Sequence, residues 1–137
     1  MFKRIFVFLM ACICLLTTFF VNKTPIFSAY SDNFEVYLYS SSSTAQILNV
    51  SKSEFYLLSN VKGQAFNAKK EDFDVAEFLM DFDANTVLVE EISEGKIYYA
   101  YSPKIKYKKE LADKAVNLQI FVGDTVKVGS PANFGSF

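Results

Sequence analysis

The chain has 137 residues, a formal net charge of −1 and no histidine or tryptophan. Both cysteines and the only arginine lie in the first 31 residues, so residues 32–137 have carboxylates, lysines, tyrosines and hydroxyls for chemistry. This composition excludes catalytic machinery built on imidazole or thiol, and it excludes zinc, copper and iron sites built on those ligands. Enzymes that use two carboxylates or a desolvated lysine are still allowed.

Residues 1–31 have the pattern of a signal peptide or an N-terminal membrane anchor. Lys3 and Arg4 precede residues 5–21, in which every residue is apolar or a threonine, and the first acidic residue is Asp32. A short basic region followed by an apolar run is typical of a signal peptide. Basic residues favour the cytoplasmic side of the membrane, so we expect residues 32–137 to lie outside the cytoplasm.

Two fates are consistent with this N-terminal segment. The small-x-small sequence Ala29-Tyr30-Ser31 favours cleavage, after which a secreted chain would begin at Asp32. Retention is the alternative, since a helix over residues 5–21 would measure about 26 Å against a hydrocarbon core of about 30 Å. In that case basic side chains such as Lys3 and Arg4 would extend to the headgroups, and the domain would be anchored to the outer face of the cytoplasmic membrane.

Charge is divided along residues 32–137, which carry a net charge of −4. Nine acidic residues lie between Glu71 and Glu94 without a lysine among them, and six lysines follow between Lys96 and Lys114. A net acidic domain without arginine is poorly suited to bind nucleic acid. The lysine-rich stretch either contacts an anionic surface or forms a solvated face that balances its acidic neighbour.

Residues 32–137 are enough for one domain with its own core, and no repeat or linker divides them. Alternation in residues 34–39 places Phe34, Val36 and Leu38 on one face of a strand. The serine-rich loop 40–43 follows. Further extended segments are predicted at 45–50, 54–61 and 64–67, with a turn at 60–63.

A short amphipathic helix is predicted over residues 72–83. Asp74 and Glu77 have the spacing of a capping box, in which the first residue caps the helix and the glutamate returns to its backbone. The apolar residues recur at helical spacing, at Phe73, Ala76, Leu79, Met80 and Phe82.

Two hairpins and a second short helix are predicted after it. The first hairpin pairs residues 86–92 with 96–101 through a three-residue loop that ends at Gly95. A helix over residues 108–115 would bury Leu111, Ala112 and Ala115. The second hairpin pairs residues 116–122 with 125–128 through Gly123-Asp124. The fold class is therefore α+β, with a single antiparallel sheet of about five to seven strands and one or two helices on one face.

The candidate binding residues are three lysines and two tyrosines. Tyr99 and Tyr101 share one face of a strand, where they would contact a partner or a sugar or serve only as favoured strand residues. Lys104, Lys106 and Lys108 alternate with apolar residues, which predicts either a cationic binding surface or the protection of an edge strand. The pattern assigns no catalytic residue, no metal site and no cofactor.

A weak calcium site is a minor alternative. Asp81, Asp83 and Asn85 have the spacing of the first ligands of a calcium loop. The glycine and the final glutamate of an EF-hand are replaced by Thr86 and Ile92, so an EF-hand is excluded. A looser site would use Asp81 and Asp83 with Glu90 or Glu91.

The C-terminal stretch carries one family resemblance. Val116-Asn117-Leu118-Gln119-Ile120 and Val128-Gly129-Ser130-Pro131 resemble the end of YwmB-like proteins. These are exported proteins of endospore-forming bacteria with a TATA-box-binding-protein-like fold. The resemblance covers about 16 of 137 residues. It implies a curved antiparallel sheet backed by helices, without catalytic residues and without DNA binding.

The sequence therefore favours a non-enzymatic, extracytoplasmic interaction domain, secreted or anchored at a bacterial cell envelope, whose partner is a protein or an envelope polymer. The alternative is a small carboxylate-dependent hydrolase acting on wall or sugar polymers. That enzyme requires two carboxylates roughly 5–10 Å apart in a cleft, one of them with a raised pKa. The candidate carboxylates are Asp72, Asp74, Glu77, Asp81, Asp83, Glu90 and Glu91.

Overall fold

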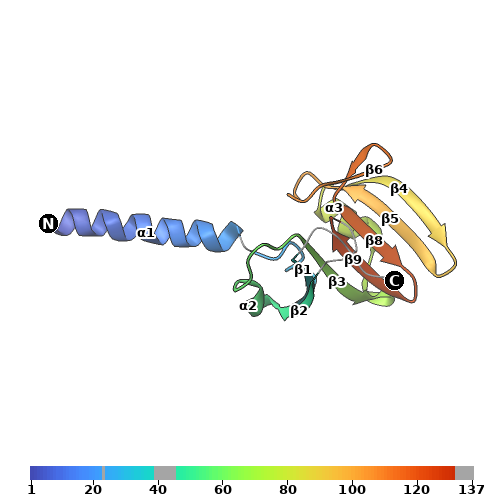
Figure 1. The fold of residues 1–137 in the computed structure, drawn as a ribbon, viewed down its shortest axis with the longest axis horizontal. Helices are drawn as coiled ribbons and strands as arrows, with labels where there is room; N and C mark the ends of the chain where they lie inside the picture. Colours follow the sequence, from blue (N-terminus) through green and yellow to red (C-terminus); the bar gives the residue numbers. More distant parts are fainter. Residues whose placement is uncertain (23, 39–45, 132–137) are drawn as a thin grey trace.

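A computed structural model describes residues 1–22, 24–38 and 46–131, with the side chains of residues 19–22 left out. Helix α1 (Phe2–Asn22) extends away from a domain built on a large antiparallel sheet (Figure 1). The predicted N-terminal helix is therefore present. Among the residues described, we find no helix that is both long enough and apolar enough to cross a membrane.

The domain has seven strands in one sheet and two more in a separate ribbon. The sheet order is β2-β1-β3-β9-β8-β5-β4, and every neighbouring pair is antiparallel. Its strands are β1 (Asn33–Tyr37), β2 (Ile47–Ser51), β3 (Gly63–Lys69), β4 (Asn85–Ile92), β5 (Gly95–Tyr101), β8 (Leu118–Val122) and β9 (Thr125–Ser130). The ribbon pairs β6 (Lys109–Leu111) with β7 (Lys114–Val116). The α+β class and the predicted strand number are confirmed.

Three short helical segments accompany the sheet: α2 (Lys52–Phe55), the 3-10 helix η1 (Lys70–Asp72) and α3 (Val75–Asp81). Helix α3 lies within the predicted range, and the Asp74 carboxylate caps it by accepting a hydrogen bond from the Glu77 backbone N–H at 3.0 Å. Its buried residue is Phe78, whereas Met80, predicted to face the core, is 77% exposed. The helix is shorter than predicted, and the side chains that pack against the core are Phe78 with Val75, Leu79 and Phe82, so Met80 lies outside that face.

One apolar face of the sheet forms the core. It takes alternate residues from each strand, including Phe34 and Val36, Leu118 and Ile120, and Val126 and Val128. The strand alternation read from residues 34–38 and 118–122 is therefore confirmed. The predicted strand ends and loop in residues 39–45 lie outside the described residues.

The segment predicted as a strand over residues 54–61 is wrong, because it begins in helix α2 and continues as turns. Ser51 and Glu54 form a complete capping box: the Ser51 side chain accepts from the Glu54 backbone, and the Glu54 carboxylate accepts from the Ser51 backbone at 2.8 Å. This serine-x-x-glutamate signal is a helix start. The apolar residues that follow Glu54 favour a strand, and the prediction followed them instead of the capping signal.

The helix predicted over residues 108–115 is also wrong. The chain forms the β6–β7 hairpin instead, with Ala112 and Asp113 in its turn at φ values of 49° and 63°. Two successive positive φ values define a hairpin turn whose twist matches that of the strands. Leu111 and Ala115 are half-buried and Ala112 is exposed, so the predicted burial of all three fails.

The hairpin between β4 and β5 is confirmed, but its loop is shorter than predicted. Ile92 pairs with Gly95, so the loop contains only Ser93 and Glu94. Gly95 has a φ of 155°, and a Cβ atom there would lie 2.1 Å from the Val122 carbonyl oxygen. Glycine is required because β8 approaches the backbone closely.

A partly buried ion pair crosses the outer face of the sheet. The Lys127 ammonium lies 2.8 Å from the Glu35 carboxylate, and both side chains keep less than a quarter of their surface exposed. Burial alone raises the pKa of Glu35. The Lys127 charge and hydrogen bonds from Tyr37 and Asn67 outweigh burial and hold that pKa below its usual value. Such a pair contributes more than an exposed one because water screens it less.

We expect Lys127→Met to lower the free energy of unfolding by about 1–2 kcal/mol at pH 7, because it leaves Glu35 partly buried without its cation. The wild-type pair contributes fully above the unfolded pKa of glutamate, about 4.3, and is lost as the pH falls through the lower folded pKa. The difference between variant and wild type should therefore shrink below about pH 4. Urea denaturation at several pH values measures this. Lys96→Met, which removes an exposed 2.8 Å pair with Glu91, should change little.

Candidate functional site

A cavity of about 530 Å³ lies where the chain leaves helix α1 and enters the domain. Its volume is typical of small-molecule sites. Thr24, two residues after the end of α1, lines it, so its wall lies within about 7 Å of the helix. The lining comes from residues 24–26, 55–61 and 104–107, and from Gln64 and Phe82. The lining residues are Thr24, Ile26, Phe55, Leu58, Ser59, Asn60, Val61, Gln64, Phe82, Lys104, Lys106 and Tyr107.

The segment that follows α1 is built into the core of the domain. Phe27 is 0% exposed, and its ring centroid lies 5.1 Å from that of Phe66 and 5.8 Å from that of Phe82. Tyr30 packs edge-on against Phe78 at 4.8 Å. Aromatic pairs at these separations add to the stability gained by burial. These residues were read from the sequence only as part of a signal peptide, so their place in the core was missed.

Tyr30 also makes a polar contact with α3. Its hydroxyl donates a hydrogen bond to the Asp81 carboxylate. Burial raises the pKa of Tyr30, and the negative charges of Asp81 and Glu77 raise it further. The tyrosine therefore stays protonated and acts as a donor throughout the physiological range.

Gln64 connects the wall of the cavity to the segment after α1. Its side-chain oxygen accepts from the Ile26 backbone N–H at 2.9 Å, and its amide nitrogen donates to the Tyr107 hydroxyl at 3.4 Å. That hydroxyl donates to the Val61 carbonyl at 3.4 Å. Burial raises the pKa of Tyr107, so its hydroxyl is neutral here. The chain of hydrogen bonds joins three stretches that are distant in sequence.

The loop that carries the lysines is held by Asn117, which is fully buried. Its side-chain oxygen accepts from the Ser102 backbone N–H at 2.7 Å, and its amide donates to the Ser102 and Ile105 carbonyls at 2.7 and 3.1 Å. The Ser130 hydroxyl donates to the Asn117 carbonyl at 2.6 Å. Every hydrogen-bonding atom of this amide has a partner, as a buried polar group requires.

Two of the predicted lysines lie at the cavity, but not on a strand. Residues 102–108 form a loop between β5 and β6, and Ile105 is buried while Lys104, Lys106 and Lys108 are exposed. The predicted alternation is therefore confirmed and the predicted edge strand is wrong. Lys104 and Lys106 line the cavity, and Lys108 does not.

The two cavity lysines have different surroundings. The Lys104 ammonium pairs with the Asp83 carboxylate at 3.0 Å and donates to the Asp81 carbonyl at 2.9 Å. Lys106 has no ion pair with any residue of the described ranges. Its positive charge is therefore available to an anionic group at the mouth of the cavity.

The predicted tyrosines do not belong to this site. Tyr99 and Tyr101 lie on β5 and line neither described cavity. The Tyr99 hydroxyl donates to the Glu90 carboxylate at 3.2 Å, and burial followed by the Glu90 charge raises the pKa of Tyr99. Tyr101 is 37% exposed. The five predicted binding residues therefore do not form one site. Lys104 and Lys106 line the cavity, whereas Lys108, Tyr99 and Tyr101 do not.

The candidate catalytic carboxylates are spread over the surface. All seven are exposed, and none lines either described cavity. Asp81 and Asp83 are engaged by Tyr30 and Lys104, and no cluster of three metal-ligating side chains occurs within the described part of the chain. A second cavity of about 440 Å³ contains Glu35 and Glu54. Hydrogen bonds from Ser51 hold the pKa of Glu54 below its usual value. Both carboxylates of the second cavity, Glu35 and Glu54, therefore have lowered pKa values.

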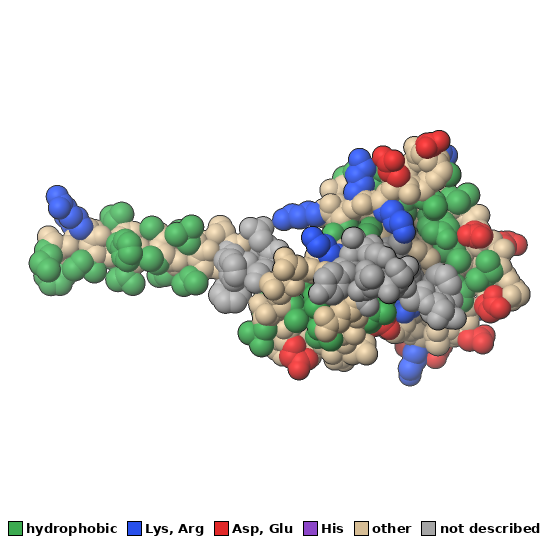
Figure 2. Space-filling model, in the orientation of Figure 1, with side chains coloured by type: hydrophobic (Ala, Val, Ile, Leu, Met, Phe, Trp, Pro, Cys, Tyr) green, Lys and Arg blue, Asp and Glu red, His purple; other side chains and the backbone are tan. Residues whose placement is uncertain are grey.

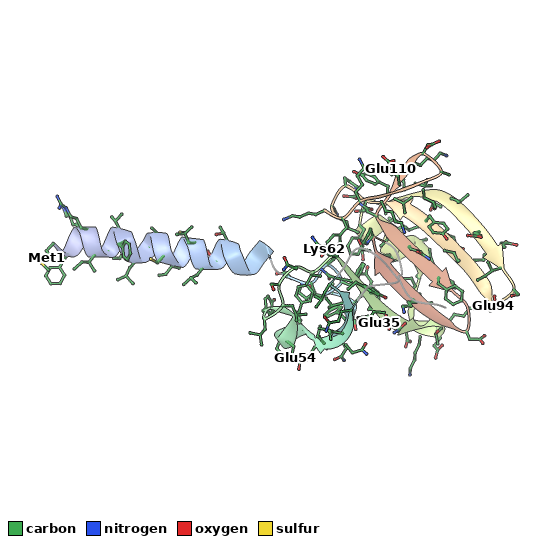
Figure 3. All side chains as sticks on the ribbon, in the orientation of Figure 1. Met1, Glu35, Glu54, Lys62, Glu94 and Glu110 are labelled. Atoms are coloured by element: carbon green, nitrogen blue, oxygen red, sulfur yellow. The ribbon has the colours of Figure 1, made fainter. Side chains whose placement is uncertain are left out.

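Charge is distributed unevenly over the face of the molecule drawn in Figure 2. Lysine side chains border the end of the domain that faces α1, and acidic side chains gather at the opposite end, over β4 and β5. Lys62 and Glu94 mark these two ends in Figure 3.

Comparison with family models, curated proteins and solved structures found no match to this chain.

Proposed function

We propose that the protein is a non-enzymatic binding domain, held by α1 at the outer face of the cytoplasmic membrane of a bacterium. The observation that carries the proposal is the continuity between α1 and the core. One residue separates the end of α1 from Thr24, and Phe27 is completely buried soon after. A cut after Ser31 would remove Phe27 and Tyr30 from the folded domain, which favours retention over release.

The surface of α1 supports a membrane location. Between Ile5 and Leu16 its side chains are apolar and nearly all exposed, among them Phe6, Phe8 and Leu15, and the domain does not cover them (Figure 1). A helix that is apolar on all sides is stable only in an apolar environment. Lys3 and Arg4 at its start favour the cytoplasmic side, which supports a domain on the outside. The apolar run of α1 is shorter than the hydrocarbon core, so the proposal requires these basic side chains to extend to the headgroups.

The carboxylates support binding over hydrolysis. A carboxylate-dependent glycosidase needs one acid that is protonated near neutral pH. The two carboxylates that share a cavity, Glu35 and Glu54, both have pKa values below the ordinary range and are ionised at that pH. The seven other candidates lie outside both described cavities.

The proposal is tested by expressing the full chain with a C-terminal tag in a bacterium. We expect the protein in the membrane fraction, beginning at its original N-terminus by mass spectrometry, and digested when protease is added to spheroplasts. Leu9→Lys with Ile13→Lys should abolish membrane insertion, since each lysine at the centre of a helix costs about 3 kcal/mol. Thr17→Ser is the matched control and should behave as wild type. A soluble secreted product that begins at Asp32, or a domain protected from protease in spheroplasts, would contradict the proposal.

A further inference from the structure

We infer that the cavity beside α1 holds one acyl chain of an anionic membrane lipid, with the lipid headgroup at Lys106. The inference rests on the proposed membrane anchoring by α1 and assigns a ligand to the domain. It is carried by three features of the cavity: its apolar walls, the charge at its mouth and its distance from the helix.

The walls suit a hydrocarbon chain. Five of the twelve lining side chains are fully apolar, and they come from the segment after α1, from the end of α2 and its following turn, and from the end of α3: Ile26, Phe55, Leu58, Val61 and Phe82. The hydroxyl of Tyr107 and the amide of Gln64 bond to each other and to backbone groups. The polar atoms of these two side chains therefore do not need hydrogen bonds from a ligand. Displacing water from such walls is favourable in proportion to the apolar area covered.

The mouth suits a negative headgroup. Lys104 and Lys106 are the charged residues among the described lining of this cavity, and no carboxylate lines it. Asp83 neutralises Lys104 and holds it in place, whereas Lys106 has no ion pair within the described residues. An apolar cavity with an unneutralised cation at its edge suits an anionic amphiphile. In a zwitterionic lipid, Lys106 could pair with the negative group of the headgroup, but the positive group would have no partner there.

The position of the cavity identifies the bilayer as the source of the lipid. Thr24 lines the cavity two residues after the end of α1, so a bilayer around that helix would reach the mouth. Leu57 is 85% exposed, next to the lining residue Leu58, where it can enter the headgroup region. Lys62 lies on the same side of the domain, toward α1 (Figure 3). Exposed leucine with lysine is typical of surfaces that rest on anionic membranes.

Photocrosslinking of the full chain in lipid nanodiscs tests the inference. Two samples of phosphatidylcholine nanodiscs each contain a minor fraction of a lipid with a diazirine in one acyl chain. In the first sample this labelled lipid is phosphatidylglycerol, and in the second it is phosphatidylcholine. We expect phosphatidylglycerol crosslinks on residues 55–61 and 104–107, about fivefold above those of phosphatidylcholine. Lys106→Met should reduce that ratio to about one. Lys108→Met removes an exposed lysine that is two residues away and does not line the cavity, so it should leave the ratio unchanged.

The possible results separate the inference from the function on which it rests. If the chain stays with the nanodiscs but crosslinks form only on α1, or form equally with both lipids, the lipid site is overturned and membrane anchoring stands. If the chain leaves the nanodiscs, both proposals are overturned. Val61→Phe, which places a larger side chain in the cavity, should lower crosslinking by both lipids without releasing the chain. Equal crosslinking in this variant and in the wild type would also overturn the site.

Discussion

Phe27→Ala should lower the free energy of unfolding by about 3–5 kcal/mol, a large part of the roughly 5–15 kcal/mol that stabilises a typical domain. The ring is fully buried and contacts Phe66, Phe78 and Phe82, so its removal leaves a cavity that the rigid sheet cannot close. Thermal and urea denaturation of the full chain in mild detergent would measure the loss. Phe27→Leu should recover most of it, because it restores much of the lost volume.

The same argument applies to truncation. A chain beginning at Thr24 should fold, whereas a chain beginning at Asp32 should lose cooperative unfolding, since it lacks both Phe27 and Tyr30. Leu57→Ala is the matched control: it removes a large apolar side chain that is 85% exposed, so stability should change by less than about 0.5 kcal/mol. Equal melting temperatures for the two truncated chains would show that residues 24–31 do not stabilise the domain.

Asn117→Ala should cost about 3–5 kcal/mol and loosen the loop that carries the cavity lysines. The substitution removes three side-chain hydrogen bonds. It takes from the buried Ser102 N–H and the Ile105 carbonyl the bonds that Asn117 makes to them, and leaves the Ser102 carbonyl with its bond from the Ile105 N–H at 3.4 Å. Each unpaired buried group costs about 1–3 kcal/mol, and the losses in one network are coupled. Hydrogen exchange at Ser102 and the urea midpoint would report the local and the global effect.

Asn85→Ala provides the control for that substitution. Asn85 is exposed at the start of β4, so its loss should shift the urea midpoint very little. If Asn117→Ala and Asn85→Ala unfold at the same urea concentration, the buried amide does not hold the loop. If Asn117→Ala is destabilised but amide exchange at Ser102 is unchanged, its effect is on core packing alone.

The fold class could be predicted because two hairpins and one capped helix have local signals. Alternation in β1 and β8 fixed which side chains face the core, and Asp74 marked the start of α3. Residues 54–61 and 108–115 were misread because short apolar stretches do not distinguish a strand from a helix. Ala112 and Asp113 form a turn that usually contains asparagine or glycine, so the turn had no clear signal.

The candidate site could be predicted only in part. Lys104 and Lys106 were found because they alternate with apolar residues in one short stretch. The cavity also needs Ile26, Phe55 and Gln64, which lie far apart in the sequence and meet only after the sheet has formed. Such contacts leave no trace in periodicity or spacing. Phe27 was missed because an apolar residue beside a signal-like helix was interpreted with that helix.

The strand order also constrains when the domain can fold. Within the described sheet, strands β1, β2 and β3 meet the other four strands only where β3 pairs with β9, for example at Gln64 and Ser130. Until synthesis reaches β9, the edge of β3 that pairs with it has no partner. Contacts of such wide sequence separation slow folding and favour late, cooperative closure. The seven-stranded sheet can therefore close only after β9 has been synthesised.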